Sequence, residues 1–146
     1  MTTHGAPNIE SHPDITAMSA RYEQMAEARS AQMTDSLTVL AGLFVALSPW
    51  IVGFHDVSVA LAMNNLVVGL VIAALGVGYA AAYDRTHRLG WVCPLLGLWT
   101  IVAVWLVSGT VAATATVMTN VIAGAVVVLL GFAAMMPYLR MQRASK

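Results

Sequence analysis

Four long apolar stretches, separated by short polar segments, dominate the chain. They cover residues 37–54, 59–83, 89–109 and 113–139. A stretch of roughly 17–25 apolar residues is long enough to cross a bilayer as an α-helix. The run from Trp91 to Met136 exceeds that length, so it must fold back once, and we place the turn at residues 110–112. The pattern therefore predicts an all-α fold, a bundle of four transmembrane helices.

The first 36 residues have a different pattern. Residues 1–12 are polar, and Pro13 with Asp14 suits a helix start because proline is tolerated in the first turn. Apolar residues then recur at helical spacing, at Ile15, Met18, Tyr22, Met25 and Met33. This spacing predicts an N-terminal amphipathic helix on the membrane surface or on a partner protein. The alternative is a short solvated helix leading into the first span, for which Ser36 is a candidate cap. No apolar region typical of a secretory signal precedes it.

Charged residues avoid the apolar stretches and make up only 10% of the chain, against about 25% in soluble domains. All seven lysines and arginines lie in residues 1–36, 84–88 or 140–146, which four spans place on one side of the membrane. The positive-inside rule then puts both termini in the cytoplasm. The formal net charge of zero gives no basic field that would indicate nucleic acid as a partner.

The two halves of the apolar region repeat each other. A shift of 55 residues aligns them without a gap, so that Trp50 falls on Trp105, Asn65 on Asn120 and Gly69 on Gly124. Each copy holds two helices, so the copies share one orientation and are related by a pseudo-twofold axis along the membrane normal. The predicted organisation is a tail (1–36), a first hairpin (37–83), a cytoplasmic connection (84–88), a second hairpin (89–139) and a C-terminal tail (140–146).

Residues 47–54 (LSPWIVGF) and 64–69 (NNLVVG) carry a resemblance to a known family. They resemble the SPW repeat family of bacterial membrane proteins, named for Ser-Pro-Trp in the first of two transmembrane helices. The resemblance covers about residues 37–139 and implies a membrane protein, without implying an activity. In the second copy Ser48-Pro49-Trp50 becomes Ala103-Val104-Trp105, so a role that needs the Ser-Pro pair belongs to the first copy. The composition, rich in Ala and Val, suits an actinobacterium.

The motif residues have structural interpretations. Pro49 removes one helix hydrogen bond and favours a kink. Ser48 can satisfy the freed carbonyl, and Trp50 and Trp105 suit the membrane interface. Ligand contact by the motif is the alternative.

Asn65 and Asn120 occupy matching sites and need partners within lipid. For both, the simplest partner is the first helix of the same hairpin, at its kinked end. Gly69 and Gly124 permit close helix approach. The alternative is an outward-facing polar cavity, in which a candidate outer cluster of His55, Asp56 and Asn64 takes part. A solvated turn is the simpler interpretation of His55 and Asp56.

Candidate catalytic chemistry is missing from the sequence. There is no metal-ligand spacing, phosphate-binding glycine loop or facing histidine pair for haem, so no catalytic, cofactor or metal residue is predicted. No carboxylate lies within a predicted span, which argues against a proton-coupled transporter. We expect a non-enzymatic, multi-pass protein of the bacterial cell membrane that acts as an accessory or scaffolding protein. Its expected partners are membrane lipid and other membrane or envelope proteins, or a second copy of the chain. The alternative is a small oligomeric transporter or channel.

Overall fold

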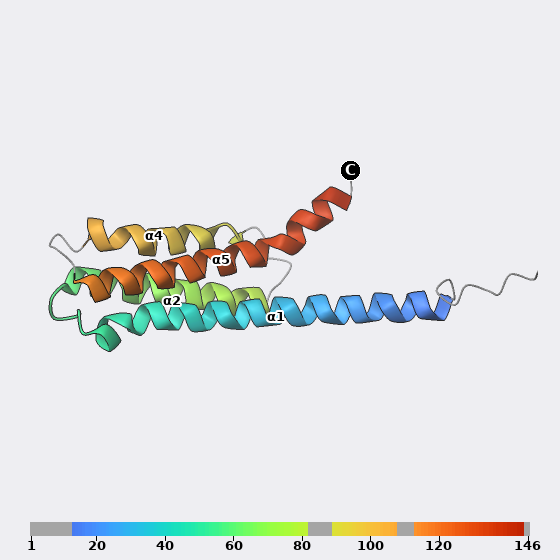
Figure 1. The fold of residues 1–146 in the computed structure, drawn as a ribbon, viewed down its shortest axis with the longest axis horizontal. Coiled ribbons are helices and arrows are strands. Elements are labelled where there is room, and N and C mark those ends of the chain that lie inside the picture. The colour runs from blue at the N-terminus through green and yellow to red at the C-terminus, as the bar shows by residue number, and fades with distance from the viewer. Residues whose placement is uncertain (1–12, 82–88, 108–112, 145–146) are drawn as a thin grey trace, which may run out of the picture. The chain divides into compact units, whose positions relative to one another are not determined.

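The computed structural model describes the backbone of residues 13–81, 89–107 and 113–144. Four helices occupy most of it: α1 (Pro13–Val52), α2 (Val59–Ala81), α4 (Val92–Leu106) and α5 (Thr114–Ala144) (Figure 1). Strands are absent from these ranges. The all-α fold class is therefore confirmed, and the predicted connections 84–88 and 110–112 lie outside the described residues.

The helix α1 passes the predicted boundary at Ser36 without a break. The prediction of a helix cap at Ser36 is therefore wrong. Its neighbours include no glycine or proline that would interrupt the helix, and Thr38 Oγ1 donates to the Thr34 carbonyl at 2.8 Å, a bond made inside a continuous helix. The chain divides instead into two compact units, residues 1–32 and 33–146. In the first unit, residues 14–30 are all exposed.

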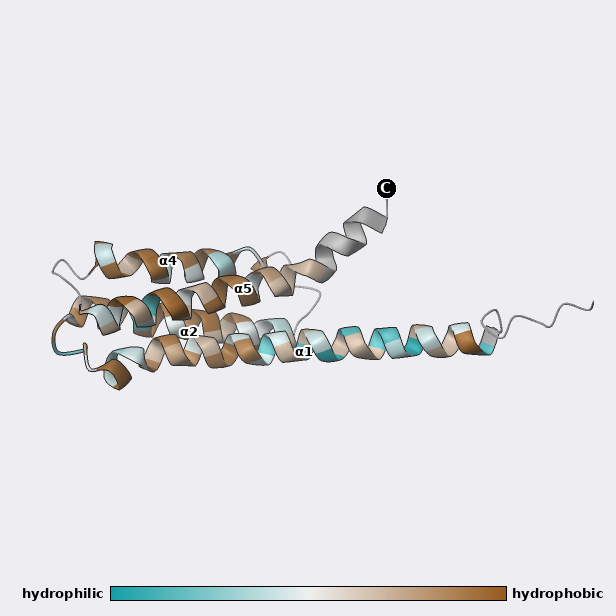
Figure 2. Cartoon of the chain, in the orientation of Figure 1, coloured by the Kyte–Doolittle hydropathy of each residue, from teal (hydrophilic) through white to brown (hydrophobic). Residues whose placement is uncertain are grey.

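Three helices contain segments long and apolar enough to cross a membrane, namely Asp14–Val52, Val59–Ala81 and Thr114–Met136. Helix α4 is apolar as well, but it has 15 residues where a span over 89–109 was predicted. Figure 2 shows the contrast in α1, whose first part carries many polar residues while its last part is mostly apolar. The helices thus indicate a membrane protein.

The helices of each hairpin meet through glycine. A Cβ added to Gly42 of α1 would lie 2.7 Å from the Gly69 carbonyl oxygen of α2, and one on Gly69 would lie 2.5 Å from the Gly42 oxygen. The second hairpin repeats this contact: the corresponding distances are 2.8 Å from Gly97 to the Gly124 oxygen and 2.6 Å in reverse. The shift of 55 residues relates the second glycine pair to the first. Each hairpin is therefore closed by the same backbone contact, at which no side chain fits.

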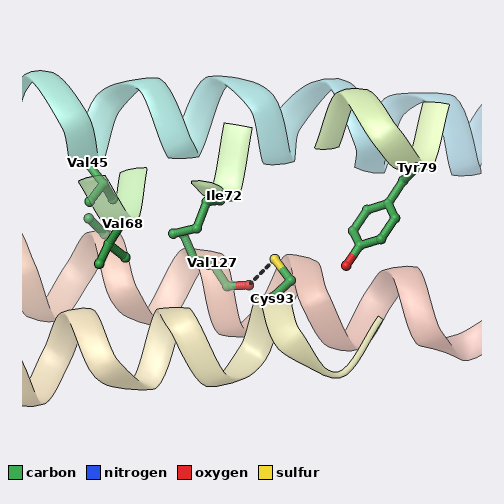
Figure 3. Close-up of a cluster of buried hydrophobic side chains, with 7 residues drawn as sticks. Val45, Val68, Ile72, Tyr79, Cys93 and Val127 are labelled. Atoms are coloured by element: carbon green, nitrogen blue, oxygen red, sulfur yellow. Dashed lines mark hydrogen bonds between the residues drawn. The ribbon is translucent and has the colours of Figure 1, made fainter. Parts of the chain in front are cut away.

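Burial follows the repeat too. Val68 and Ala123, Ile72 and Val127, and Thr38 and Cys93 are buried, as are Val45 and Thr100. Six of them, with Tyr79, form one core that draws on all four helices (Figure 3); its members are Val45, Val68, Ile72, Tyr79, Cys93, Ala123 and Val127. Since equivalent positions of the two hairpins are buried, each hairpin turns the same face toward the other, as the pseudo-twofold axis predicts.

Candidate functional site

In the Ser-Pro pair of the motif, the serine hydroxyl replaces the backbone hydrogen-bond donor that the proline lacks in α1. Pro49 has no backbone N–H, so the carbonyl of Val45, four residues earlier, receives no helix bond from it. Ser48 Oγ donates to that carbonyl at 2.8 Å, and Ser48 and Val45 are each 1% exposed. The serine thus supplies the donor that the proline removes. The helix continues through Pro49 to Val52, and a kink there stays a prediction.

The end of α1 is fixed by the same proline. The Pro49 carbonyl accepts hydrogen bonds from the backbone N–H groups of Gly53, Phe54 and His55 at 3.1, 3.0 and 3.2 Å. Gly53 has φ of +80°, a left-handed conformation in which glycine commonly ends helices. The chain therefore turns sharply after Val52, toward α2.

Asn65 connects the motif to the second hairpin. Its Nδ2 donates to Ser48 Oγ at 3.3 Å and to Asn120 Oδ1 at 2.8 Å, and both asparagines are 1% exposed. Asn65 thus makes the expected contact with the first helix of its hairpin, beside a shorter bond to the equivalent asparagine. The side chain of Asn120 bonds to Asn65 and to its own helix α5 rather than to the expected α4. Residues related by a twofold axis contact each other when they lie close to that axis. The match of Asn65 with Asn120 in the repeat could therefore have predicted this bond.

Further hydrogen bonds extend from this pair into a network across four helices. Asn120 Nδ2 donates to the Thr116 carbonyl at 3.0 Å, and Asn64 Nδ2 donates to Asn65 Oδ1 at 3.4 Å. Trp99 Nε1 of α4 donates to Asn64 Oδ1 at 3.0 Å. We call Ser48, Asn64, Asn65, Trp99 and Asn120 the amide network. In the part of the chain that the structure describes, no buried side-chain nitrogen or oxygen lacks a partner. The network can therefore hold the helices together without water.

The turn after α1 contains His55 and Asp56, and we call it the outer turn because it is predicted to face outward. Its side chains contact each other and Trp50 rather than the amide network. His55 Nε2 and Asp56 Oδ2 are 3.2 Å apart, with side chains 36% and 85% exposed. The ring of His55 stacks on Trp50, with ring centroids 6.1 Å apart and planes at 21°. Asn64, which the sequence grouped with these two, bonds to Trp99 and Asn65 instead. Trp50 and Trp105 are 46% and 60% exposed, and their place at the membrane interface stays a prediction.

Asp35 is a buried residue that sequence reasoning assigned to the tail. It is 8% exposed and lies inside the continuous helix α1, two residues before the predicted first span at residues 37–54. The signal was its spacing from Thr38, Gly42 and Val45, which places all four on one face of the helix. Among the described residues, no group of three or more His, Cys, Asp or Glu side chains could hold a metal ion.

Replacing Ser48 by alanine tests the link between the serine and the proline. The variant should lower the free energy of unfolding by about 1 kcal/mol, since the Val45 carbonyl loses its donor in a buried position. In a Pro49→Ala background the new backbone N–H can bond to that carbonyl, so Ser48→Ala should cost clearly less. The free energy of unfolding in detergent is measured for the parent chain, Ser48→Ala, Pro49→Ala and the double variant. If Ser48→Ala costs the same with and without Pro49, the serine does not act for the proline.

Comparison with known proteins gives one family. A model described as the SPW repeat domain matches residues 32–134. The curated proteins and the solved structures contain no match.

Proposed function

Because the chain belongs to the SPW repeat family, we propose that it is a non-enzymatic, multi-pass protein of the bacterial cell membrane that acts as an accessory or scaffolding protein. It works by binding other proteins rather than by transforming a substrate. The observation that carries this proposal is the row of exposed apolar side chains in the first unit.

This row comprises Ile15, Met18, Tyr22 and Met25, which are 43%, 55%, 68% and 68% exposed. Their spacing of three and four residues places them on one face of α1. Methionine is a flexible, adaptable side chain, and both methionine and tyrosine are enriched at protein interfaces. Contiguous exposed apolar residues on the more polar first part of a helix suit a docking surface. We call these four residues the docking row.

The bundle supports a scaffolding role in a different way. Its buried polar side chains bond to one another or to the backbone, as the amide network does, and its helices contact closely through glycine. Such packing favours one rigid arrangement. A rigid membrane bundle that carries an exposed helix suits an anchor for a partner.

The orientation that we propose has both termini in the cytoplasm, and it is supported by the lysines and arginines, which all lie in the segments expected on one side of the membrane. Val57 in the outer turn is 79% exposed, so a Val57→Cys chain in a Cys93→Ala background should react with a membrane-impermeant thiol reagent added outside intact cells. Glu23→Cys should react only after the cells are broken. The reverse pattern would contradict the orientation.

The docking row is tested by changing it without changing the bundle. A chain with Met18→Ser, Tyr22→Ser and Met25→Ser should lose its co-purifying protein after mild crosslinking and gentle detergent extraction. We expect at least a tenfold loss of the crosslinked partner by quantitative mass spectrometry, since each buried apolar side chain contributes about 1.5–3 kcal/mol.

The matched control changes the polar side of the same helix, with Glu23→Ala, Gln24→Ala and Glu27→Ala, three positions that are also exposed. It should retain the partner. Equal retention by both chains would contradict a docking role for the row. Flux of ions or small solutes in proteoliposomes that contain the chain alone would favour the transporter instead.

A further inference from the structure

Two hydrogen bonds between the hairpins have no symmetry-related counterpart. In one, Tyr79 Oη of the first hairpin donates to the Leu89 carbonyl at 3.0 Å, whereas Ala134, which the repeat relates to Tyr79, has no side-chain donor.

The other bond involves a side chain on each hairpin. Trp99 of the second hairpin donates to Asn64 of the first at 3.0 Å. The repeat relates Trp99 to Phe44 and Asn64 to Thr119. Phe44 and Trp99 are 44% and 43% exposed, as expected of two repeat-related positions with equivalent surroundings. Because phenylalanine has no donor, the symmetry-related bond cannot form.

This asymmetry distinguishes the pairs that such hairpins can form. A first hairpin bound to another first hairpin would place Asn64 opposite Phe44, and its Oδ1 would lose the indole donor. The asparagine at the axis offers no such distinction, since Asn65 and Asn120 supply the same amide to either pair. Thr119 is no equal substitute for Asn64, because its side chain is shorter and is held against its own helix, where the hydroxyl donates to the Ala115 carbonyl at 2.8 Å.

We propose that Asn64 and Trp99 are specificity-determining residues, which make the first hairpin bind a hairpin that carries Trp99 in preference to a second copy of itself. The partner that occupies the Asn64 face of the first hairpin is thus the second hairpin. In lipid no water replaces a lost partner, so a single bond of this kind discriminates between otherwise similar surfaces. The bond prevents two chains from associating through their first hairpins.

Crosslinking between full-length chains tests the proposal. Ile72 is fully buried in the core beside Val127 of the other hairpin (Figure 3). In a Cys93→Ala background, Ile72→Cys joins two chains by a disulfide only where their first hairpins pair. The chain with both Ile72→Cys and Val127→Cys reports the normal pairing within one chain, and confirms that each variant folds.

Two changes should raise the crosslinked fraction of the Ile72→Cys chain at high protein density in the bilayer. Trp99→Phe removes the bond from the normal pair. Phe44→Trp supplies a donor for Asn64 in the pair of first hairpins. We expect about threefold to thirtyfold more dimer relative to monomer per bond lost or gained, from the measured range for hydrogen bonds between membrane helices.

The matched controls are Trp105→Phe and Leu47→Trp, which remove or add an indole at positions 60% and 53% exposed without touching Asn64. They should leave the crosslinked fraction at the level of the parent chain. The proposal is overturned if all the chains give the same fraction, including none, or if the controls raise it as much as Trp99→Phe and Phe44→Trp do.

Discussion

Gly69→Ala is expected to lower the free energy of unfolding by about 2 kcal/mol, although alanine is the better helix former. A Cβ at position 69 would lie 2.5 Å from the Gly42 oxygen and 2.8 Å from Ala46 Cα, and closer still to the Ala46 nitrogen. These atoms belong to the backbone of α1 and cannot move aside as a side chain does. The two helices must therefore separate, and the contacts around the first hairpin weaken.

The sign of this effect separates packing from helix propensity. Propensity alone would make Gly69→Ala stabilising by about 1 kcal/mol. At the exposed position 74 of α2, Ala74→Gly should cost about that amount, as propensity predicts. Gly124→Ala in the second hairpin should cost less than Gly69→Ala. There the nearest atom, at 2.5 Å, belongs to the Ile101 side chain, and only one backbone atom, the Gly97 oxygen at 2.6 Å, is comparably close. Unfolding by denaturant in detergent measures each, and stabilisation by Gly69→Ala would contradict the close backbone contact.

The second large effect is expected for Asn65→Leu, which should cost about 2 kcal/mol. Asn65 makes three hydrogen bonds, donating to Ser48 and Asn120 and accepting from Asn64. Its loss leaves the buried Oδ1 of Asn120 without that donor. Asn120→Leu should cost less, because Asn65 keeps Ser48 as an acceptor. The structure thus predicts unequal effects at two positions that the repeat makes equivalent.

A double-mutant cycle measures how far the two asparagines act as a pair. The chain with Asn65→Leu and Asn120→Leu should lose less free energy of unfolding than the sum of the single losses, since no unpaired amide then remains at the axis. Thr119→Leu, at an intermediate position one residue from Asn120, is the control and should add independently. Strict additivity of the two asparagine changes would show that they do not interact.

Much of the arrangement follows from local and periodic features that a sequence displays directly. The length of the apolar stretches predicts helices that cross a membrane, and the exact shift by 55 residues predicts two hairpins in one orientation. The Ser48-Pro49 pair predicts its own bond to the helix carbonyl, because the missing N–H and the serine hydroxyl lie within one turn. The boundary at Ser36 failed because a polar residue without glycine or proline beside it does not end a helix.

What the sequence by itself determined is the membrane class, the repeat and the residues available for polar contacts in lipid. Only the tertiary structure decided that Asn65 bonds to Asn120, that Trp99 bonds to Asn64 rather than leaving Asn64 to the outer turn, and that Asp35 is buried. The physical reason is that each of these depends on how helices distant in sequence are rotated about their axes. Gly42 with Gly69, and Gly97 with Gly124, fix that rotation by permitting backbone contact on one face alone. The periodicity of one helix contains no information about which side of another helix it meets.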